Sequence, residues 1–423
     1  MVSSLQPNMF LSNIVVIYRR FPRQFWLMFF GMLLSTIGTS MIWPFLMIYV
    51  SERLVMPMTA VASLLTINSA VVLISSFMAG PIIDRFGRKW MMVASLALNG
   101  IYFLFLGQAD TYLSFALLMV MGGLVNPVYR VGADAMLADL IPPEKRIDAY
   151  SIMRLSNNAG IAIGPAIGGF IASTSYGLAF LFAASGMIAY SLLLVIFARE
   201  TLPTGPAIGD TPSIQREKLG GYLTILKDLP FMRVVLAFIM VTVCASTMWV
   251  LMPVYAKQNY QIPESLYGFI PTTNALMVVF LQLFVTRITK RHPPLLVMMA
   301  GAAFYTVATI SVSFAHAFWG FWIAMVIMTI GELVIVPTSS TYVANLAPTA
   351  KRGRYMSIYG LSWGAATGIG SLLGGFLNDF FGPHAIWYGA GLIGTTATIL
   401  FLSYYLRYKD TTSISVVPSS PTK

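Results

Sequence analysis

The chain has 423 residues, of which 57% are hydrophobic and only 10% charged, and its formal net charge at pH 7 is +11. Ordinary soluble domains carry about 25% charged residues, so this composition excludes a soluble domain and indicates a protein whose solvent is the lipid bilayer. The positive charge does not indicate a nucleic-acid partner, because the bases are scattered over short loops instead of gathering on one face.

Apolar windows of about 20 residues, the length that crosses a bilayer as a helix, recur along the whole chain. They predict an all-α membrane protein with twelve transmembrane helices in two six-helix bundles. The predicted spans are 25–50, 59–82, 89–107, 112–140, 147–173, 177–198, 231–256, 265–287, 295–315, 318–346, 355–380 and 386–407. The expected domains are a cytoplasmic segment at 1–24, a first bundle at 25–198, a cytoplasmic linker at 199–230, a second bundle at 231–407 and a cytoplasmic tail at 408–423.

The lysines and arginines favour one orientation of these spans. Of the 26 in the chain, Arg53 and Lys257 fall on the side away from the amino terminus, Arg130 and Arg154 fall within spans, and the other 22 fall on the side of the amino terminus. Loops rich in Lys and Arg stay in the cytoplasm. The bias therefore predicts a multi-pass protein of the cell (inner) membrane with both termini in the cytoplasm.

The amino-terminal segment from Met9 to Arg23 mixes apolar residues with arginines. This mixture suits a short helix in the membrane interface and equally a partly ordered cytoplasmic start. The apolar run that follows is longer than a signal-peptide core and has no small-residue cleavage site after it, so we interpret it as the first span.

Several kinds of chemistry find no support in the sequence. The one cysteine, Cys244, falls inside a span, and the three histidines do not stand at metal-ligand spacing, so we expect no disulfide, metal site or cofactor. No phosphate-binding loop of the GxxxxGK[ST] type occurs, which argues against drive by ATP. No nucleophile, base and orienting group converge, so an enzyme is not expected.

The loop between the second and third spans concentrates charge. Gly80, Asp84, Arg85, Gly87 and Arg88 stand between two long apolar segments. A glycine at position 80 permits close approach of another helix, and Gly87 supplies a permissive turn. The bases favour a cytoplasmic position for this loop.

Charges also occur inside the spans, where they are costly unless paired or facing water. Arg130 and Asp134 are four residues apart in the fourth span, a spacing at which they can neutralise each other, and Arg154 lies at a similar depth in the fifth. These three residues are either a structural ion-pair cluster or a cavity wall that exchanges partners when a substrate or proton binds.

Glu332 stands apart from these, because its span carries no base. Desolvation disfavours the charged form of such a carboxyl group, so Glu332 suits a cycle in which a proton is taken up and released. The alternative is an acid that bonds to a neighbouring hydroxyl or to a base of the fourth span for stability alone.

The two halves of the chain repeat each other at a shift of 206 residues. Pro142, Lys145 and Arg146 then meet Pro348, Lys351 and Arg352, and Gly164, Gly168 and Gly169 meet Gly370, Gly374 and Gly375. Because each half has an even number of spans, the repeats share one orientation, and parallel repeats about an axis along the membrane normal are typical of transporters.

With these features together, nearly the whole chain resembles the major facilitator superfamily, and more narrowly its twelve-span bacterial drug/proton antiporters. The loop 2–3 motif of the family is matched at every fixed position, by Gly80, Asp84, Arg85, Gly87, Arg88 and Lys89. The resemblance implies a conformational latch between the halves. In it, Asp84 lies near the start of the eleventh span, and Arg88 pairs with an acid at the end of the fourth span, here Asp139.

A second stretch resembles the antiporter motif of the family in the fifth span. It comprises Gly160, Gly164, Pro165, Gly168 and Gly169, and three of these glycines form one helix stripe suited to close packing. Ser151 replaces an earlier glycine of the motif, which weakens the inference to antiport. Close packing of small residues explains the same glycines.

The resemblance further implies that the first, fourth, seventh and tenth spans line a central cavity. The expected cavity residues are Trp43, Asn126, Arg130 and Trp249, and the expected proton-coupling residues are Glu332 and Asp134. The expected function is proton-coupled export of lipophilic or cationic small molecules by a monomer embedded in lipid. The alternative is a symporter or uniporter for a peptide, sugar or other metabolite.

Overall fold

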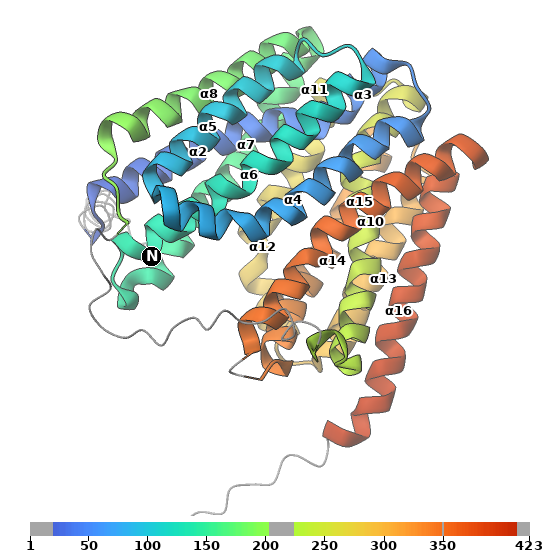
Figure 1. Ribbon diagram of the computed structural model, residues 1–423. Helices are drawn as coiled ribbons and strands as arrows, with labels where there is room; N and C mark the ends of the chain where they lie inside the picture. Colours follow the sequence, from blue (N-terminus) through green and yellow to red (C-terminus); the bar gives the residue numbers. More distant parts are fainter. Residues whose placement is uncertain (1–19, 203–223, 349–350, 413–423) are drawn as a thin grey trace, which may run out of the picture.

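The computed structural model describes residues 20–202, 224–348 and 351–412, and these residues form helices without any strand (Figure 1). The predicted segment Met9 to Arg23 lies almost entirely outside the described residues, as do most of the expected linker and tail. The helices are α2 (Arg23–Ile42), η1 (Trp43–Phe45), α3 (Leu46–Leu54), α4 (Met58–Phe86), α5 (Arg88–Leu106), α6 (Tyr112–Leu140), η2 (Pro143–Lys145), α7 (Arg146–Thr174), α8 (Tyr176–Phe197), α10 (Leu229–Tyr260), α11 (Glu264–Tyr267), α12 (Phe269–Thr289), α13 (Pro294–Val312), α14 (Phe318–Leu346), α15 (Arg352–Phe381) and α16 (Ala385–Thr412).

Twelve transmembrane helices arise from these elements, as predicted, because α2, η1 and α3 form one bent span and α11 and α12 another. Among the described residues, ten spans are long and apolar enough to cross a membrane by hydropathy alone. The other two, α7 and α15, have 29 and 30 residues but are rich in glycine, serine and charged residues. Both pack between other helices, where small side chains permit close approach.

The 206-residue repeat is confirmed by the helix bounds. α2 and α10 begin at Arg23 and Leu229, and α4 and α11 begin at Met58 and Glu264, each pair 206 residues apart. The same shift relates the starts of α5 and α13, of α6 and α14, and of α7 and α15. The halves therefore share one pattern of helices although most of their side chains differ.

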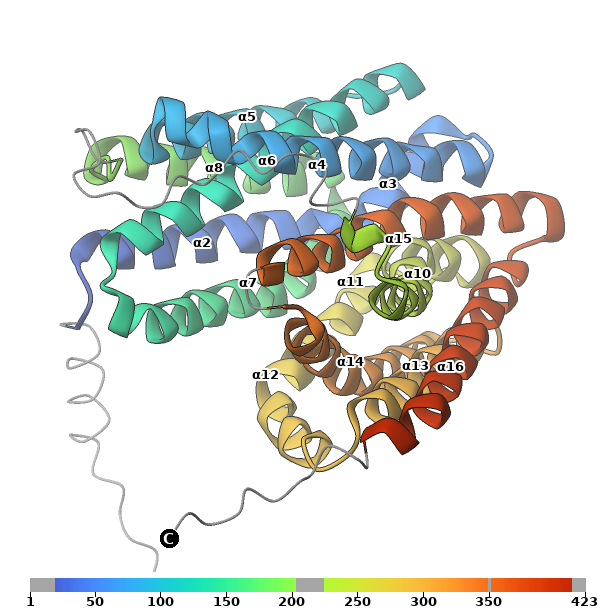
Figure 2. The ribbon, with the colours of Figure 1, turned by 60° about the horizontal axis from the view of Figure 1, so that its bottom comes forward.

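The helices pack as two six-helix groups that meet along two seams (Figures 1 and 2). In the first group α2 lies against α7 and α8, and α6 lies against α4 and α5; in the second, α13 lies against α14 and α16, and α10 against α15. One seam joins α4 to α15, and the other joins α7 to α11 and α12. The expected fold, two bundles of the major facilitator type, is confirmed.

The helix ends lie at two faces of the bundle. The terminal face is the one with the helix ends Arg23, Phe86, Leu140, Arg146, Thr289 and Arg352. The opposite face is the one with the helix ends Leu54, Met58, Thr174, Glu264 and Phe381.

Along the α4–α15 seam, packing is close near the opposite face and ends toward the terminal face. A methyl group placed on Gly375 would lie 2.9 Å from the carbonyl oxygen of Met58, and one on Gly364 would lie 3.1 Å from a side-chain carbon of Leu73. Gly360, on the same stripe of α15, has no such atom within 4 Å. The two helices therefore diverge toward the terminal face, as the ribbon also shows (Figure 1).

Gly80 does not have the close helix contact that the sequence predicted, because no atom of another segment would lie within 4 Å of a methyl group placed on it. The reason is the same divergence, since Gly80 lies on the part of α4 beyond its contacts with α15. In this conformation the glycine faces open space.

Candidate functional site

The predicted latch loop forms a compact charged cluster at the terminal face. Gly87 has a φ of +95°, which a glycine adopts without strain, and it separates α4 from α5. Arg88 Nε lies 3.0 Å from Asp139 Oδ2, so the expected contact between these residues is present. Asp84 lies 3.4 Å from Arg88, and its side chain is 69% exposed. Arg85 rests its guanidinium over the ring of Phe86.

Glu200, just after α8, completes this cluster and was not predicted. Its carboxylate accepts hydrogen bonds from the backbone N–H groups of Arg88 at 2.9 Å and Lys89 at 3.0 Å, at the start of α5. Thr201 also donates its hydroxyl to Asp139 at 3.1 Å. A carboxylate at a helix start is favoured by the helix dipole, but Glu200 is 112 residues away from Arg88 in the chain, so no sequence signal indicated this contact. All these contacts stay within the first half.

The glycine stripe of α7 packs on α2, a helix of the same half. Methyl groups placed on Gly160 and Gly164 would lie 2.6 Å from side-chain carbons of Thr36 and Ser40, and Gly168 packs on the backbone of Met41. The stripe therefore fixes α7 to α2. Two other residues of the motif contact the second half instead: the backbone of Gly169 meets that of Glu264, and the backbone of Pro165 meets that of Gly268.

The two predicted cavity tryptophans come together where the halves meet. Trp43 and Trp249, which correspond under the 206-residue repeat, line one small hollow with Leu46, Leu65 and other apolar residues. Trp43 belongs to the short 3-10 turn within the first span, and Trp249 lies in α10. The hollow has aromatic walls contributed by both halves.

The predicted ion-pair cluster of Arg130, Asp134 and Arg154 is absent. All three side chains are exposed, as is Asn126, and the ion pairs among the described residues include none of them. The helix spacing allows Arg130 to reach Asp134, but in this conformation the two side chains make no direct ion pair. Asn126, Arg130 and Asp134 instead form one polar stripe along α6.

Glu332 is half-buried in α14, and its partner is an amide instead of a cation. Asn274 of α12 donates from Nδ2 to Glu332 Oε2 at 2.9 Å and to Thr329 Oγ1 at 3.0 Å. Within the described part of the chain, no base pairs with Glu332. The buried Asn274 was missed by sequence reasoning, although a lone asparagine within an apolar span was the signal.

At the opposite face, side chains join the halves directly. Asp379 of α15 accepts hydrogen bonds from Met58 N at 2.9 Å, Thr59 N at 2.7 Å and Thr59 Oγ1 at 2.6 Å, and so caps the start of α4. On the other seam Glu264 accepts from the Tyr176 hydroxyl at 2.9 Å and pairs with Lys257 at 3.0 Å. None of these residues was predicted.

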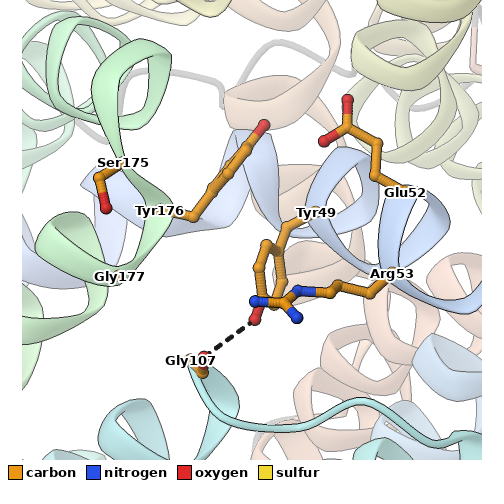
Figure 3. Close-up of a pocket in the computed structure, with 7 residues that line it drawn as sticks. All are labelled: Tyr49, Glu52, Arg53, Gly107, Ser175, Tyr176 and Gly177. Carbon is orange, nitrogen blue, oxygen red and sulfur yellow. Dashed lines mark hydrogen bonds between the residues drawn. The ribbon is translucent and has the colours of Figure 1, made fainter.

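Beside Tyr176 lies an open pocket of about 450 Å³ in the first half (Figure 3). It is lined by Tyr49, Glu52, Arg53, Gly107, Ser175, Tyr176 and Gly177. Arg53 lies over the ring of Tyr49, whose hydroxyl donates to the carbonyl of Gly107 at 3.1 Å. None of the predicted site residues lines this pocket.

Comparison with known proteins places the chain in a large family of transporters. The sequence profile of the Major Facilitator Superfamily matches residues 28–263 and again residues 234–419. The chain is 26% identical over 379 residues to a Na(+), Li(+), K(+)/H(+) antiporter of Planococcus maritimus, covering 83% of this chain and 87% of the relative. It is 22% identical over 393 residues to the quinolone resistance protein NorA of Staphylococcus aureus, covering 92% and 99%.

Among solved structures, a peptide transporter in complex with alafosfalin superposes with a TM-score of 0.75 at 18% identity, covering 92% of this chain and 95% of that one. This likeness concerns the fold. The repeat, the twelve spans and the loop motif agree with the profile match, and the chain belongs to the Major Facilitator Superfamily.

Proposed function

We propose that this membrane transporter exports lipophilic or cationic small molecules in exchange for protons, and that it does so by alternating access. Two relatives support this proposal by their names, one an antiporter of cations and protons and the other a quinolone resistance protein. Trp43 and Trp249 also place aromatic side chains from both halves beside each other, and aromatic rings favour contact with flat apolar compounds.

The orientation of the chain is part of the proposal. The bases gather at the terminal face, and cytoplasmic loops are rich in Lys and Arg, so we assign the terminal face and both termini to the cytoplasm. With that assignment the described conformation is closed toward the outside and opens toward the cytoplasm. Each half supplies helices to both seams, so a single chain suffices for transport.

The proposal of proton coupling is supported mainly by the environment of Glu332. It is a half-buried carboxyl group of a span, with an amide donor at 2.9 Å and no paired base in the described residues. A carboxyl group held in this way can exist with or without its proton, because the protonated form is neutral and the carboxylate accepts a hydrogen bond from the Asn274 amide. Proton binding at Glu332 would then bias the exchange between the two access states. Asp134, exposed on α6, is the second candidate for a coupled acid.

The test is accumulation of lipophilic cations and neutral drugs in everted vesicles, with the pH gradient intact or collapsed. We expect gradient-dependent accumulation by the wild type and none by Glu332→Gln, with expression unchanged. Glu144→Gln, at an exposed acid beyond the end of α6, is the matched control and should transport normally. Full proton-driven accumulation by Glu332→Gln would refute the role of Glu332.

The second candidate function is a symporter or uniporter for a peptide, sugar or other metabolite. The observation that favours it is the polar stripe of Asn126, Arg130 and Asp134, which is more hydrophilic than a purely apolar substrate requires. If no compound of the drug panel accumulates with or without the gradient, this second function becomes the better account.

A further inference from the structure

Two arginines inside the first half make no direct ion pair among the described residues, although Asp134 lies near Arg130. Arg130 of α6 lies ten residues before the helix end at Leu140, and Arg154 of α7 lies eight residues after the helix start at Arg146. At 1.5 Å per residue the two lie about 15 Å and about 12 Å from the terminal face, at a similar depth. Both are exposed.

Arg154 faces the second half of the molecule. Arg154, Asn158, Pro165 and Gly169 stand at intervals of four, seven and four residues, so they share one stripe of α7. Near the opposite face this stripe contacts the second half, because Pro165 meets the backbone of Gly268 and Gly169 meets that of Glu264. Toward the terminal face, where the halves separate, the same stripe exposes Arg154.

Arg130 faces away from the lipid. The apolar exposed stripe of α6 is formed by Leu113, Leu117 and Leu124, which are 67%, 62% and 48% exposed. Arg130 follows Leu124 by six residues, which at 100° per residue turns it about a third of a turn away from the leucines. An exposed charge at this depth that avoids the lipid must face water.

The helices that carry the two arginines approach each other at this level. Tyr150, one turn before Arg154, donates its hydroxyl to the carbonyl oxygen of Asp134, one turn after Arg130, at 3.2 Å. The facing parts of α6 and α7 form one wall, which carries the two guanidinium groups and the carboxylate of Asp134. These three groups give the wall a net charge of about +1. A guanidinium binds a carboxylate through two parallel N–H···O bonds.

We propose that Arg130 and Arg154 form a binding site for a carboxylate of the transported compound. The preferred substrates are then lipophilic acids and zwitterions, whose negative group lies against the arginines. This inference rests on the proposed function and narrows it, because a compound with only positive charge gains nothing from this wall.

The experiment compares rhodamine B, which has a free carboxylate, with its ethyl ester, which has the same ring system without the negative charge. Binding of each dye to the purified full chain in phosphatidylcholine nanodiscs is measured by fluorescence anisotropy. The wild type should bind the acid about tenfold more tightly than the ester, the size expected for one charged hydrogen-bonded contact.

Arg130→Gln and Arg154→Gln should each lose most of this preference and keep the affinity for the ester, which shows that the variants are folded. Arg154→Lys should retain part of the preference for the acid. The control Arg233→Gln, at an exposed arginine of the second half, should retain the whole preference. Failure of the wild type to bind the acid, equal binding of both dyes, or equal losses for both dyes in the variants would overturn the site.

Proton-driven accumulation of the same dyes in everted vesicles separates this inference from the proposed function. Preference for the acid without any dependence on the pH gradient would refute proton coupling and support the site. Gradient-driven transport of both dyes without preference would support the coupling and refute the site.

Discussion

The opposite face and the terminal face of the same twelve helices differ in what joins the two halves. At the opposite face, Asp379 caps a helix of the other half, and Glu264 bonds to Tyr176 across the second seam. At the terminal face, the charged groups of the latch loop bond within the first half, where Arg88 pairs with Asp139. The polar contacts between halves are thus concentrated at one face.

Because few polar contacts join the halves, and these lie at one face, the same fold can exchange which face is closed. Each cap or hydrogen bond of this kind is worth about 1 kcal/mol, so the few that join the opposite face can be offset by binding a substrate or a proton. Asp84, exposed beside the start of α5, is free to bond elsewhere when the terminal face closes. The glycines of α4 and α15 that now face open space, Gly80 and Gly360, leave room for that closure.

The largest effect is expected from a disulfide that locks the terminal face shut. Leu73 of α4 contacts Gly364 of α15. Seven residues from this contact toward the terminal face, α4 carries Gly80 and α15 carries Ser357. Because Cys244 is the one native cysteine, the pair Gly80→Cys and Ser357→Cys can be made in a Cys244→Ser background. We expect this pair to cross-link only when the terminal face closes, and transport then to fall to background. Transport and cross-linking are measured before and after reduction.

The control pair is Ser69→Cys with Gly368→Cys, at positions whose Cβ atoms would lie 3.5 Å apart, within the range of disulfides. It should cross-link at once in the described conformation. Immediate cross-linking of both pairs would contradict the divergence of α4 and α15.

A smaller effect is expected when the cap at the opposite face is removed. Asp379→Ala leaves the N–H groups of Met58 and Thr59 without their acceptor, at a cost of about 1–2 kcal/mol, which favours conformations open at that face about tenfold. A cysteine at Leu46, buried in the hollow between the halves, should then react about tenfold faster with an impermeant maleimide.

Asp110→Ala removes an exposed acid of the same face that lies outside the seams and serves as the control. If the cysteine at Leu46 reacts with the maleimide at the same rate in Asp379→Ala and in Asp110→Ala, the cap does not hold the halves together.

The smallest effect is expected at Glu200. Burial raises the pKa of its carboxyl group, but hydrogen bonds from the backbone N–H groups of Leu202, Arg88, Thr201 and Lys89 outweigh this and hold the pKa below its ordinary value. Such a group stabilises the fold above its unfolded pKa of about 4.3, and the stabilisation is lost as the pH falls through the folded pKa. In thermal unfolding, the free energy of unfolding of Glu200→Gln should thus be about 1 kcal/mol lower than that of the wild type at pH 7. This difference should vanish in acid.

Glu200→Gln should leave the opposite face unaffected, because the hydrogen bonds of Glu200 lie within one half. The labelling rate of the cysteine at Leu46 should be unchanged in Glu200→Gln. A rate as high as in Asp379→Ala would mean that the latch cluster, too, controls opening at the opposite face.

Much of the fold could be predicted from the sequence, because apolar length alone dictates a membrane helix. The fourth and tenth spans were predicted at 112–140 and 318–346, where α6 and α14 lie. The contact of Arg88 with Asp139 was also predicted, since it follows from residues at fixed positions of a motif.

The partners of the site residues could not be predicted, for reasons that lie in the packing. Asn274 reaches Glu332 from a different helix, and Asp379 reaches α4 from the other half of the chain. Such contacts depend on how the helices are placed, about which hydropathy says nothing. The pair Arg130 and Asp134 was predicted from spacing alone, and in this conformation the two side chains make no direct ion pair.

Distances between spin labels at both faces test alternating access most directly. One label pair replaces Glu144 and Arg291 in exposed loops of the terminal face, and the other replaces the exposed Gln108 and Phe314 at the opposite face. Adding substrate or shifting the pH should shorten the first distance and lengthen the second in the same fraction of molecules. Changes at one face alone, or in the same direction at both, would contradict the account.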